Sequence, residues 1–147
     1  MRRWFLGAAL AVGLGGAAQA ADFVVVQSSD PAIARGATYE SGALIQLAAG
    51  QSIVLVDTAG QVTRLVGGPR GAVVPRMQVA SMNEERMAVL KMLVAPPRMR
   101  RSGPTLPNCP QADLGTIDGI FTVAQVDGCL TTARTAFDAY VEKALKP

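Results

Sequence analysis

Short apolar runs separated by glycine-containing connectors fill residues 43–66, and this spacing restricts the segment to a β fold. The connectors, Ala49-Gly50-Gln51 and Thr58-Ala59-Gly60-Gln61, share the triplet Ala-Gly-Gln. Glycine at such points permits the positive backbone angles of tight hairpin turns. The pattern predicts an antiparallel meander. Its expected strands are 43–48 (ALIQLA), 52–57 (SIVLVD) and 62–66 (VTRLV).

Two further strands and a helix are expected around this meander. The β-branched run Phe23-Val24-Val25-Val26 predicts a first strand, and Ala72-Val73-Val74 a short last one. Residues 81–94 have helical rhythm, with Ser81 and Glu84 as a capping box. The apolar stripe of this helix consists of Met87, Leu90, Leu93 and Val94.

The C-terminal third is expected to be helical. Residues 111–127 combine helical spacing of apolar side chains with glycines that weaken a helix, so a short helix is favoured and a strand stays open. A final helix should be capped by Thr131 or Thr132. Its predicted stripe is Phe137, Tyr140, Val141, Ala144 and Leu145.

These elements predict an α+β protein. A small antiparallel meander or sandwich-like domain with a terminal helix should span 21–95, and a loop rich in Pro and Arg should span 96–110. A helical segment over 111–147 follows, tethered by a disulfide.

Residues 1–20 are typical of a cleaved export signal. Arg2 and Arg3 precede a short Gly/Ala-rich apolar run, and Ala18-Gln19-Ala20 is a small-x-small cleavage motif. We therefore expect a periplasmic or secreted protein with no transmembrane anchor after cleavage. The start RRWFL matches the twin-arginine pattern, so export by that route and by the general secretory route both remain open.

The two cysteines, Cys109 and Cys129, are expected to form a structural disulfide. In an oxidising compartment an isolated pair is most simply a bridge. A metal pair and a redox pair are the alternatives, although the close Cys-x-x-Cys spacing of redox motifs is absent.

The chain contains no histidine, which removes the catalytic schemes and zinc sites that depend on imidazole. We therefore lean towards a non-enzyme without a cofactor. A small envelope hydrolase using carboxylates is the alternative, but Asp113, Asp118 and Asp127 are interpreted as turn and cap residues. The lysines, Lys91, Lys143 and Lys146, are expected on solvent-facing helix surfaces.

A second alternative is copper binding through methionine, because thioethers are soft ligands. Five methionines lie in one stretch, but a spacing of five turns successive side chains to different faces of a helix. Filling of gaps in the core is the favoured interpretation. They are Met77, Met82, Met87, Met92 and Met99.

The candidate interaction residues are Arg98, Arg100 and Arg101, a basic group on the Pro-rich loop. Without Arg2 and Arg3 the chain keeps 12 basic and 11 acidic residues, so no nucleic-acid partner is expected. An acidic partner, an anionic head group or a cell-wall polymer would suit these arginines, and a plain solvated loop is the alternative.

The segment Gly42–Arg70 (GALIQLAAGQSIVLVDTAGQVTRLVGGPR) resembles the FecR-like periplasmic β domain in its cadence of short strands and glycine turns. The stretch from Phe23 to Ser29 is similar to the start of small uncharacterised exported proteins of proteobacteria. The resemblance implies a β-sandwich-like module that binds through protein contacts without a cofactor, and it carries over no functional residue. Unlike membrane-bound FecR regulators, this chain shows no transmembrane or anti-sigma part, so direct signalling across a membrane is not expected. The expected partner is another envelope protein.

Overall fold

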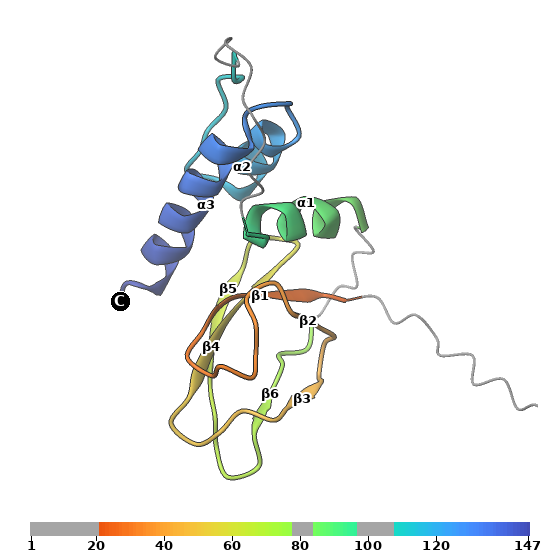
Figure 1. The fold of residues 1–147 in the computed structure, drawn as a ribbon, viewed down its shortest axis with the longest axis vertical. Helices are drawn as coiled ribbons and strands as arrows, with labels where there is room; N and C mark the ends of the chain where they lie inside the picture. The colour runs from red at the N-terminus through yellow and green to blue at the C-terminus, as the bar shows by residue number, and fades with distance from the viewer. Residues whose placement is uncertain (1–20, 78–83, 97–107) are drawn as a thin grey trace, which may run out of the picture.

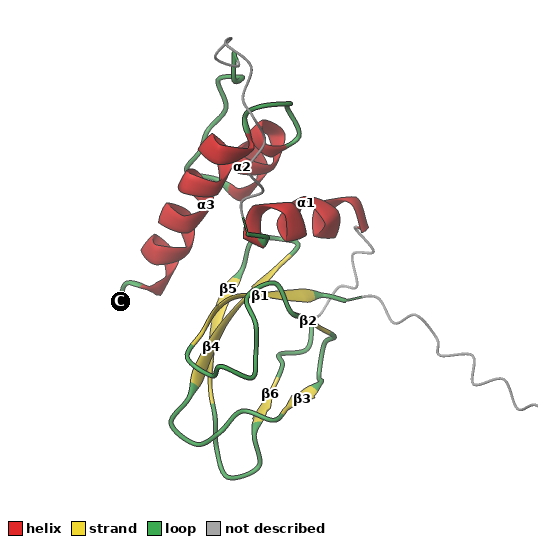
Figure 2. Ribbon diagram, in the orientation of Figure 1, coloured by secondary structure: helices red, strands yellow, loops and turns green. Residues whose placement is uncertain are grey.

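A computed structural model describes residues 21–77, 84–96 and 108–147 of the chain. Within these ranges the protein has the α+β architecture that the sequence predicts, with strands gathered on one side and helices on the other (Figures 1 and 2). The strands are β1 (Phe23–Ser28), β2 (Thr38–Tyr39), β3 (Leu44–Ile45), β4 (Ser52–Asp57), β5 (Val62–Val66) and β6 (Ala72–Val73). The helices are α1 (Glu84–Val94), α2 (Ile117–Ala124) and α3 (Leu130–Leu145).

The strands form two antiparallel sheets. The larger sheet has the order β2-β1-β4-β5, and β3 pairs with β6 in a separate two-stranded ribbon. The β4–β5 hairpin is the one expected from its glycine connector, but the first strand of the predicted meander does not join it. That strand shortens to Leu44–Ile45 and pairs across to Ala72–Val73, while β1 becomes the neighbour of β4. Local turn chemistry cannot specify such a distant pairing.

Both faces of the central strands are buried, which explains their unbroken apolar runs. On one face Val24 and Val56 pack against the helices. On the other face Val25 and Leu55 pack against the β3–β6 ribbon, where Val74 is fully buried. The larger sheet therefore lies between a helical layer and a small β layer, so the β part is sandwich-like.

Helix α1 lies across one end of the larger sheet (Figure 1). Its predicted stripe is confirmed, because Met87, Leu90, Leu93 and Val94 are all buried. Ser81, the expected partner of Glu84 in a capping box, lies outside the described residues.

The ambiguous region 111–127 contains the helix α2. The side chain of Thr116 caps it, since its Oγ1 accepts a hydrogen bond of 3.2 Å from the N–H of Gly119. Gly119, which argued against a helix in the sequence, is needed because a Cβ atom there would collide with the carbonyl oxygen of Asp113. Gly119 thus weakens helix propensity but allows the turn before α2 to fold back onto the helix.

Helix α3 begins earlier than expected. Its N-cap is Cys129, with no side-chain cap hydrogen bond, so the predicted caps Thr131 and Thr132 are wrong. Cys129 is fully buried and bonded to Cys109, so the disulfide anchors the residue that precedes the first turn of the helix. In the predicted stripe Phe137 and Val141 are buried, and Ala144 is exposed.

All three helices share one hydrophobic cluster with the sheet. It contains Leu90 from α1, Ile120 from α2 and Phe137 from α3 together with Val54 of β4. The C-terminal helices are thus packed on the same core as the β part. No helix in the described ranges has the length and apolarity that crossing a bilayer requires.

Candidate functional site

Titratable side chains from different elements meet at the turn between β4 and β5. Asp57 ends β4 and is almost fully buried. Its Oδ1 accepts hydrogen bonds of 2.9 Å from the N–H groups of Ala59 and Gln61. An aspartate that accepts bonds from the following backbone stabilises a turn. Gly60 completes the turn with φ of +86°.

Each of the three helices contacts this turn. From α1, Arg86 donates its Nε–H to the carbonyl oxygen of Thr58 at 2.7 Å. From α3, the hydroxyl of Tyr140 donates to the carbonyl oxygen of Gly60 at 2.7 Å. From α2, Ile117 packs closely against the turn, because a Cβ atom added to Gly60 would lie 2.6 Å from the Cβ atom of Ile117. We call Asp57, Gly60, Arg86, Asp118 and Tyr140 the turn clamp.

Within the turn clamp Arg86 pairs with one of the two carboxylates, that of Asp118. Its Nη1 donates to Asp118 Oδ1 at 2.6 Å, and its guanidinium carbon lies 4.8 Å from the centre of the Phe121 ring. Burial raises the pKa of the Tyr140 phenol above its ordinary 10.0, and the carboxylates of Asp57 and Asp118 raise it further. The phenol therefore stays protonated and continues to donate its hydrogen bond at neutral pH.

Chemically, the turn clamp holds the helices on the sheet. Its donors and acceptors are engaged with each other, and the described part of the chain has no buried side-chain polar atom without a hydrogen-bond partner. A phenol whose pKa is raised is a poor base at neutral pH, and a guanidinium does not release its proton in proteins. The arrangement supports packing between layers, with Arg86 and Tyr140 as its two ties.

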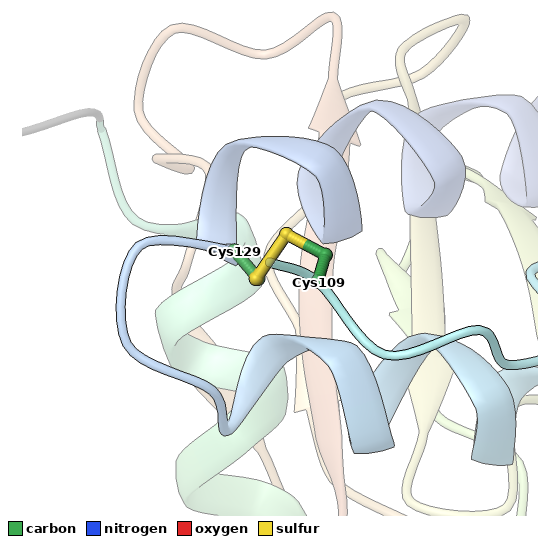
Figure 3. The surroundings of a disulfide bond; sticks show 2 residues. All are labelled: Cys109 and Cys129. Atoms are coloured by element: carbon green, nitrogen blue, oxygen red, sulfur yellow. A yellow bond between two sulfur atoms is a disulfide. The ribbon is translucent and has the colours of Figure 1, made fainter. Parts of the chain in front are cut away.

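The predicted disulfide is present between Cys109 and Cys129, whose Cα atoms are 5.6 Å apart (Figure 3). It joins the segment before α2 to the N-cap residue of α3. Cys129 is fully buried among side chains of the helical core, and Cys109 is partly buried beside it. This placement is that of a structural bridge, which fits the interpretation of the sequence.

The other residues singled out in the sequence are dispersed. Arg98, Arg100 and Arg101 lie outside the described residues, so the interaction site assigned to them stays a prediction. Asp113 forms a turn with the N–H of Gly115, and Asp118 pairs with Arg86. The exposed side chains include Asp127 and the three lysines, Lys91, Lys143 and Lys146.

The methionines that lie in the described ranges do not converge. Met87 is buried in the helical core, Met77 packs against the cluster on the other face of the sheet, and Met92 is exposed. Met82 and Met99 lie outside these ranges. No group of three or more acidic or cysteine side chains suited to a metal ion occurs among the described residues.

Exposed apolar side chains occur on the strands. Leu44 and Val73 are opposite each other in the β3–β6 ribbon and are 57% and 60% exposed, and Val66 at the end of β5 is 62% exposed. A shallow, mostly apolar groove of about 470 Å³ runs along the outer side of α3. Its lining is Leu114, Thr131, Thr132, Thr135, Ala136 and Ala139.

Most of the turn clamp carries no recognisable signal in the sequence. Asp57 followed by Thr-Ala-Gly has the composition of a turn, so its role was detectable. Tyr140 was placed on the core stripe, but nothing signalled that its hydroxyl would reach Gly60, 80 residues earlier. Arg86 gave no signal either, because an arginine on an amphipathic helix is ordinarily solvated.

No protein-family model, no curated protein and no solved structure matches this chain.

Proposed function

We propose that this protein is an exported, non-enzymatic module of the cell envelope that binds another envelope protein without a cofactor. Its location would be the periplasm or the exterior. The leader-like residues 1–20 support export, and the Cys109–Cys129 bridge supports an oxidising compartment. The resemblance of Gly42–Arg70 to the FecR-like β domain supports binding through protein contacts.

One observation carries the proposal. The hydrogen-bonding side chains of Arg86 and Tyr140 are used in holding helices on the β4–β5 turn, whereas apolar side chains are left in solvent on the strands. When a partner covers an apolar side chain that is more than half exposed, the burial of its apolar surface favours binding. Leu44, Val66 and Val73 are such side chains.

The test is crosslinking of the mature protein, residues 21–147, in its native envelope, followed by mass spectrometry of partners and of the disulfide. The proposal expects one recurring protein partner crosslinked to protein with joined Cys109 and Cys129. Recovery of the mature protein without any crosslinked partner would overturn the proposal.

The basic loop is tested in the same assay. Replacing Arg98, Arg100 and Arg101 by Gln removes their charges without altering the described core. If these arginines contact the partner, the crosslinking yield of the triple variant should fall. An unchanged yield would remove them from the proposed interface.

A further inference from the structure

Strand β5 forms one end of the larger sheet, and no strand of the described ranges pairs with its outer edge. At the beginning of the strand Val62 packs against the helical core. Arg64 and Val66 lie beyond this contact and are exposed. An open edge presents backbone groups that an added strand can bind.

The hydrogen-bond pattern between β4 and β5 determines which backbone groups of β5 point away from β4. Bonds from Gly67 N–H to the Gln51 oxygen (2.8 Å) and from Asp57 N–H to the Gln61 oxygen (3.2 Å) define hydrogen-bonded pairs at both ends of the hairpin. Such pairs alternate along an antiparallel ladder. Thr63 and Leu65 are therefore bonded to β4, and the N–H and C=O groups of Arg64 and Val66 point away from it.

The side chains of Arg64 and Val66 project from the same face of the sheet, because they are two residues apart. Arg64 forms no side-chain hydrogen bond or ion pair with the described part of the chain. An added strand would thus meet two pairs of free backbone groups, an unpaired guanidinium and an exposed apolar side chain.

The segment of the sequence that contains this strand carries charge of one sign. From Thr58 to Asn83 the sequence contains no Asp or Glu and three arginines, Arg64, Arg70 and Arg76. All three side chains are exposed. This charge favours an acidic occupant and disfavours a basic one.

We propose that the edge of β5 receives an extended segment of the partner protein by strand addition, with a carboxylate beside Arg64 and an apolar side chain beside Val66. The inference rests on the proposed function and names its surface and partner chemistry. Strand addition of this kind obtains affinity from main-chain hydrogen bonds and specificity from alternate side chains. A second copy of β5 is a poorer occupant, because VTRLV has no carboxylate to pair with Arg64.

The first experiment uses a synthetic peptide as the probe, acetyl-Thr-Val-Thr-Glu-Thr-Val-Thr-amide, at millimolar concentration. In the free protein the amides of Arg64 and Val66 should exchange with solvent much faster than those of Thr63 and Leu65. With the peptide bound, exchange at Arg64 and Val66 should slow at least tenfold. Unchanged exchange at these two amides would overturn the inference.

Two variants test the recognition. Val66→Pro removes only an outward N–H, which an edge strand tolerates, and Arg64→Glu reverses the charge. Each should weaken peptide binding at least tenfold, and a peptide with Lys in place of Glu should bind Arg64→Glu better than the wild type. The matched control, Leu44→Thr/Val73→Thr, should bind the original peptide as the wild type does.

The same variants separate this inference from the proposed function. If the wild type crosslinks a partner in the envelope and Val66→Pro and Arg64→Glu crosslink it equally well, the β5 edge is not the interface, although the module still binds a protein. If the wild type crosslinks none, the proposed function itself fails. A dimer of the wild type that Val66→Pro abolishes would identify a second copy as the occupant and overturn the acidic partner.

Discussion

At the scale of single residues, the β4–β5 turn leaves no room for a side chain at Gly60. Gly60 has a positive φ and meets Ile117 directly, so it must lack a side chain for two separate reasons. The carbonyl oxygens of Thr58 and Gly60 each accept a hydrogen bond from a helix. A change of one atom in this turn therefore affects the contact between layers.

Replacing Gly60 by Ala should strongly destabilise the protein. The positive φ costs about 1–2 kcal/mol for a residue with a Cβ atom, and crowding Ile117 adds about 1–3 kcal/mol. Urea unfolding followed by circular dichroism measures the sum. The control is Gly50→Ala, where φ is +82° but no atom lies within 4 Å of the added Cβ, so only the backbone cost should appear. Equal losses in the free energy of unfolding of both variants would mean that Ile117 moves aside without destabilising the protein.

Replacing Tyr140 by Phe should cost about 1 kcal/mol at pH 7, since the hydrogen bond to Gly60 is lost. The folded protein raises the pKa of this phenol above 10.0, so the stability linked to its protonation is complete below pH 10 and is lost as the pH rises through the folded pKa. Unfolding free energies from pH 7 to 11 should therefore fall more steeply for the wild type than for Tyr140→Phe. Parallel curves would contradict the pKa shift.

At the scale of elements, Arg86 and the disulfide provide two of the long-range ties that hold the helices in place. Arg86 links α1 to the β4–β5 turn and to α2, and the Cys109–Cys129 bridge links the segment before α2 to the start of α3. The sequence revealed the second tie, because two cysteines in a mature chain leave one intramolecular pairing. The first depends on where three elements meet and could not be predicted.

Arg86→Met should lower the free energy of unfolding by about 2 kcal/mol, because it removes a charged donor to Thr58 and the contact with Phe121. Asp118→Asn should cost less than about 1 kcal/mol, since its side chain is 75% exposed and solvent screens the pair. Chemical denaturation of both variants tests the ranking. The opposite order would mean that the Arg86–Asp118 ion pair contributes more to stability than the contacts of Arg86 with Thr58 and Phe121.

Replacing both cysteines by Ala should destabilise the protein by about 3 kcal/mol, the chain-entropy value for a ring of this size. The loss should be greatest in the first turn of α3, where the N–H of Ala133 bonds to the Cys129 oxygen. Thermal unfolding gives the total, and hydrogen exchange at Ala133 relative to Leu55 gives its location. An unchanged melting temperature would show that packing alone holds α3.

At the scale of the whole molecule, the larger sheet separates two hydrophobic clusters. The cluster on the helix side unites side chains of all three helices with β1 and β4, and the other cluster unites the same strands with β3 and β6. Because β1 and β4 contribute to both, neither layer can unfold without exposing a face of the central strands.

We therefore expect a single cooperative unfolding transition for the protein that begins at Ala21. This protein contains no Trp, and in Tyr140→Phe the only remaining tyrosine is Tyr39 on the β side. Tyrosine fluorescence then follows the β layers, while ellipticity at 222 nm follows chiefly the helices. The two midpoints should coincide in urea. Separate midpoints would show that the helical segment 111–147 unfolds on its own.

The sequence alone determined the local features of this protein. The hairpin strands at 52–57 and 62–66, the buried stripe of α1 and the cysteine pair follow from alternation, turn residues and counting, and the structure confirms each. These features depend on interactions between residues close in the chain or on the absence of alternatives. The start of α3 also shows how tertiary structure modifies such a prediction, since its N-cap is the disulfide-bonded Cys129 and not a threonine.

Only the tertiary structure decided how the elements are joined. The pairing of β3 with β6, the insertion of β4 beside β1 and the hydrogen bond from Tyr140 to Gly60 connect residues far apart in the chain. Their free energy comes from burying both faces of β1 and β4 at once, and periodicity shows that a face is apolar but not which element covers it. The open edge of β5 arises in the same way, because a strand becomes an edge only when its neighbours have been chosen.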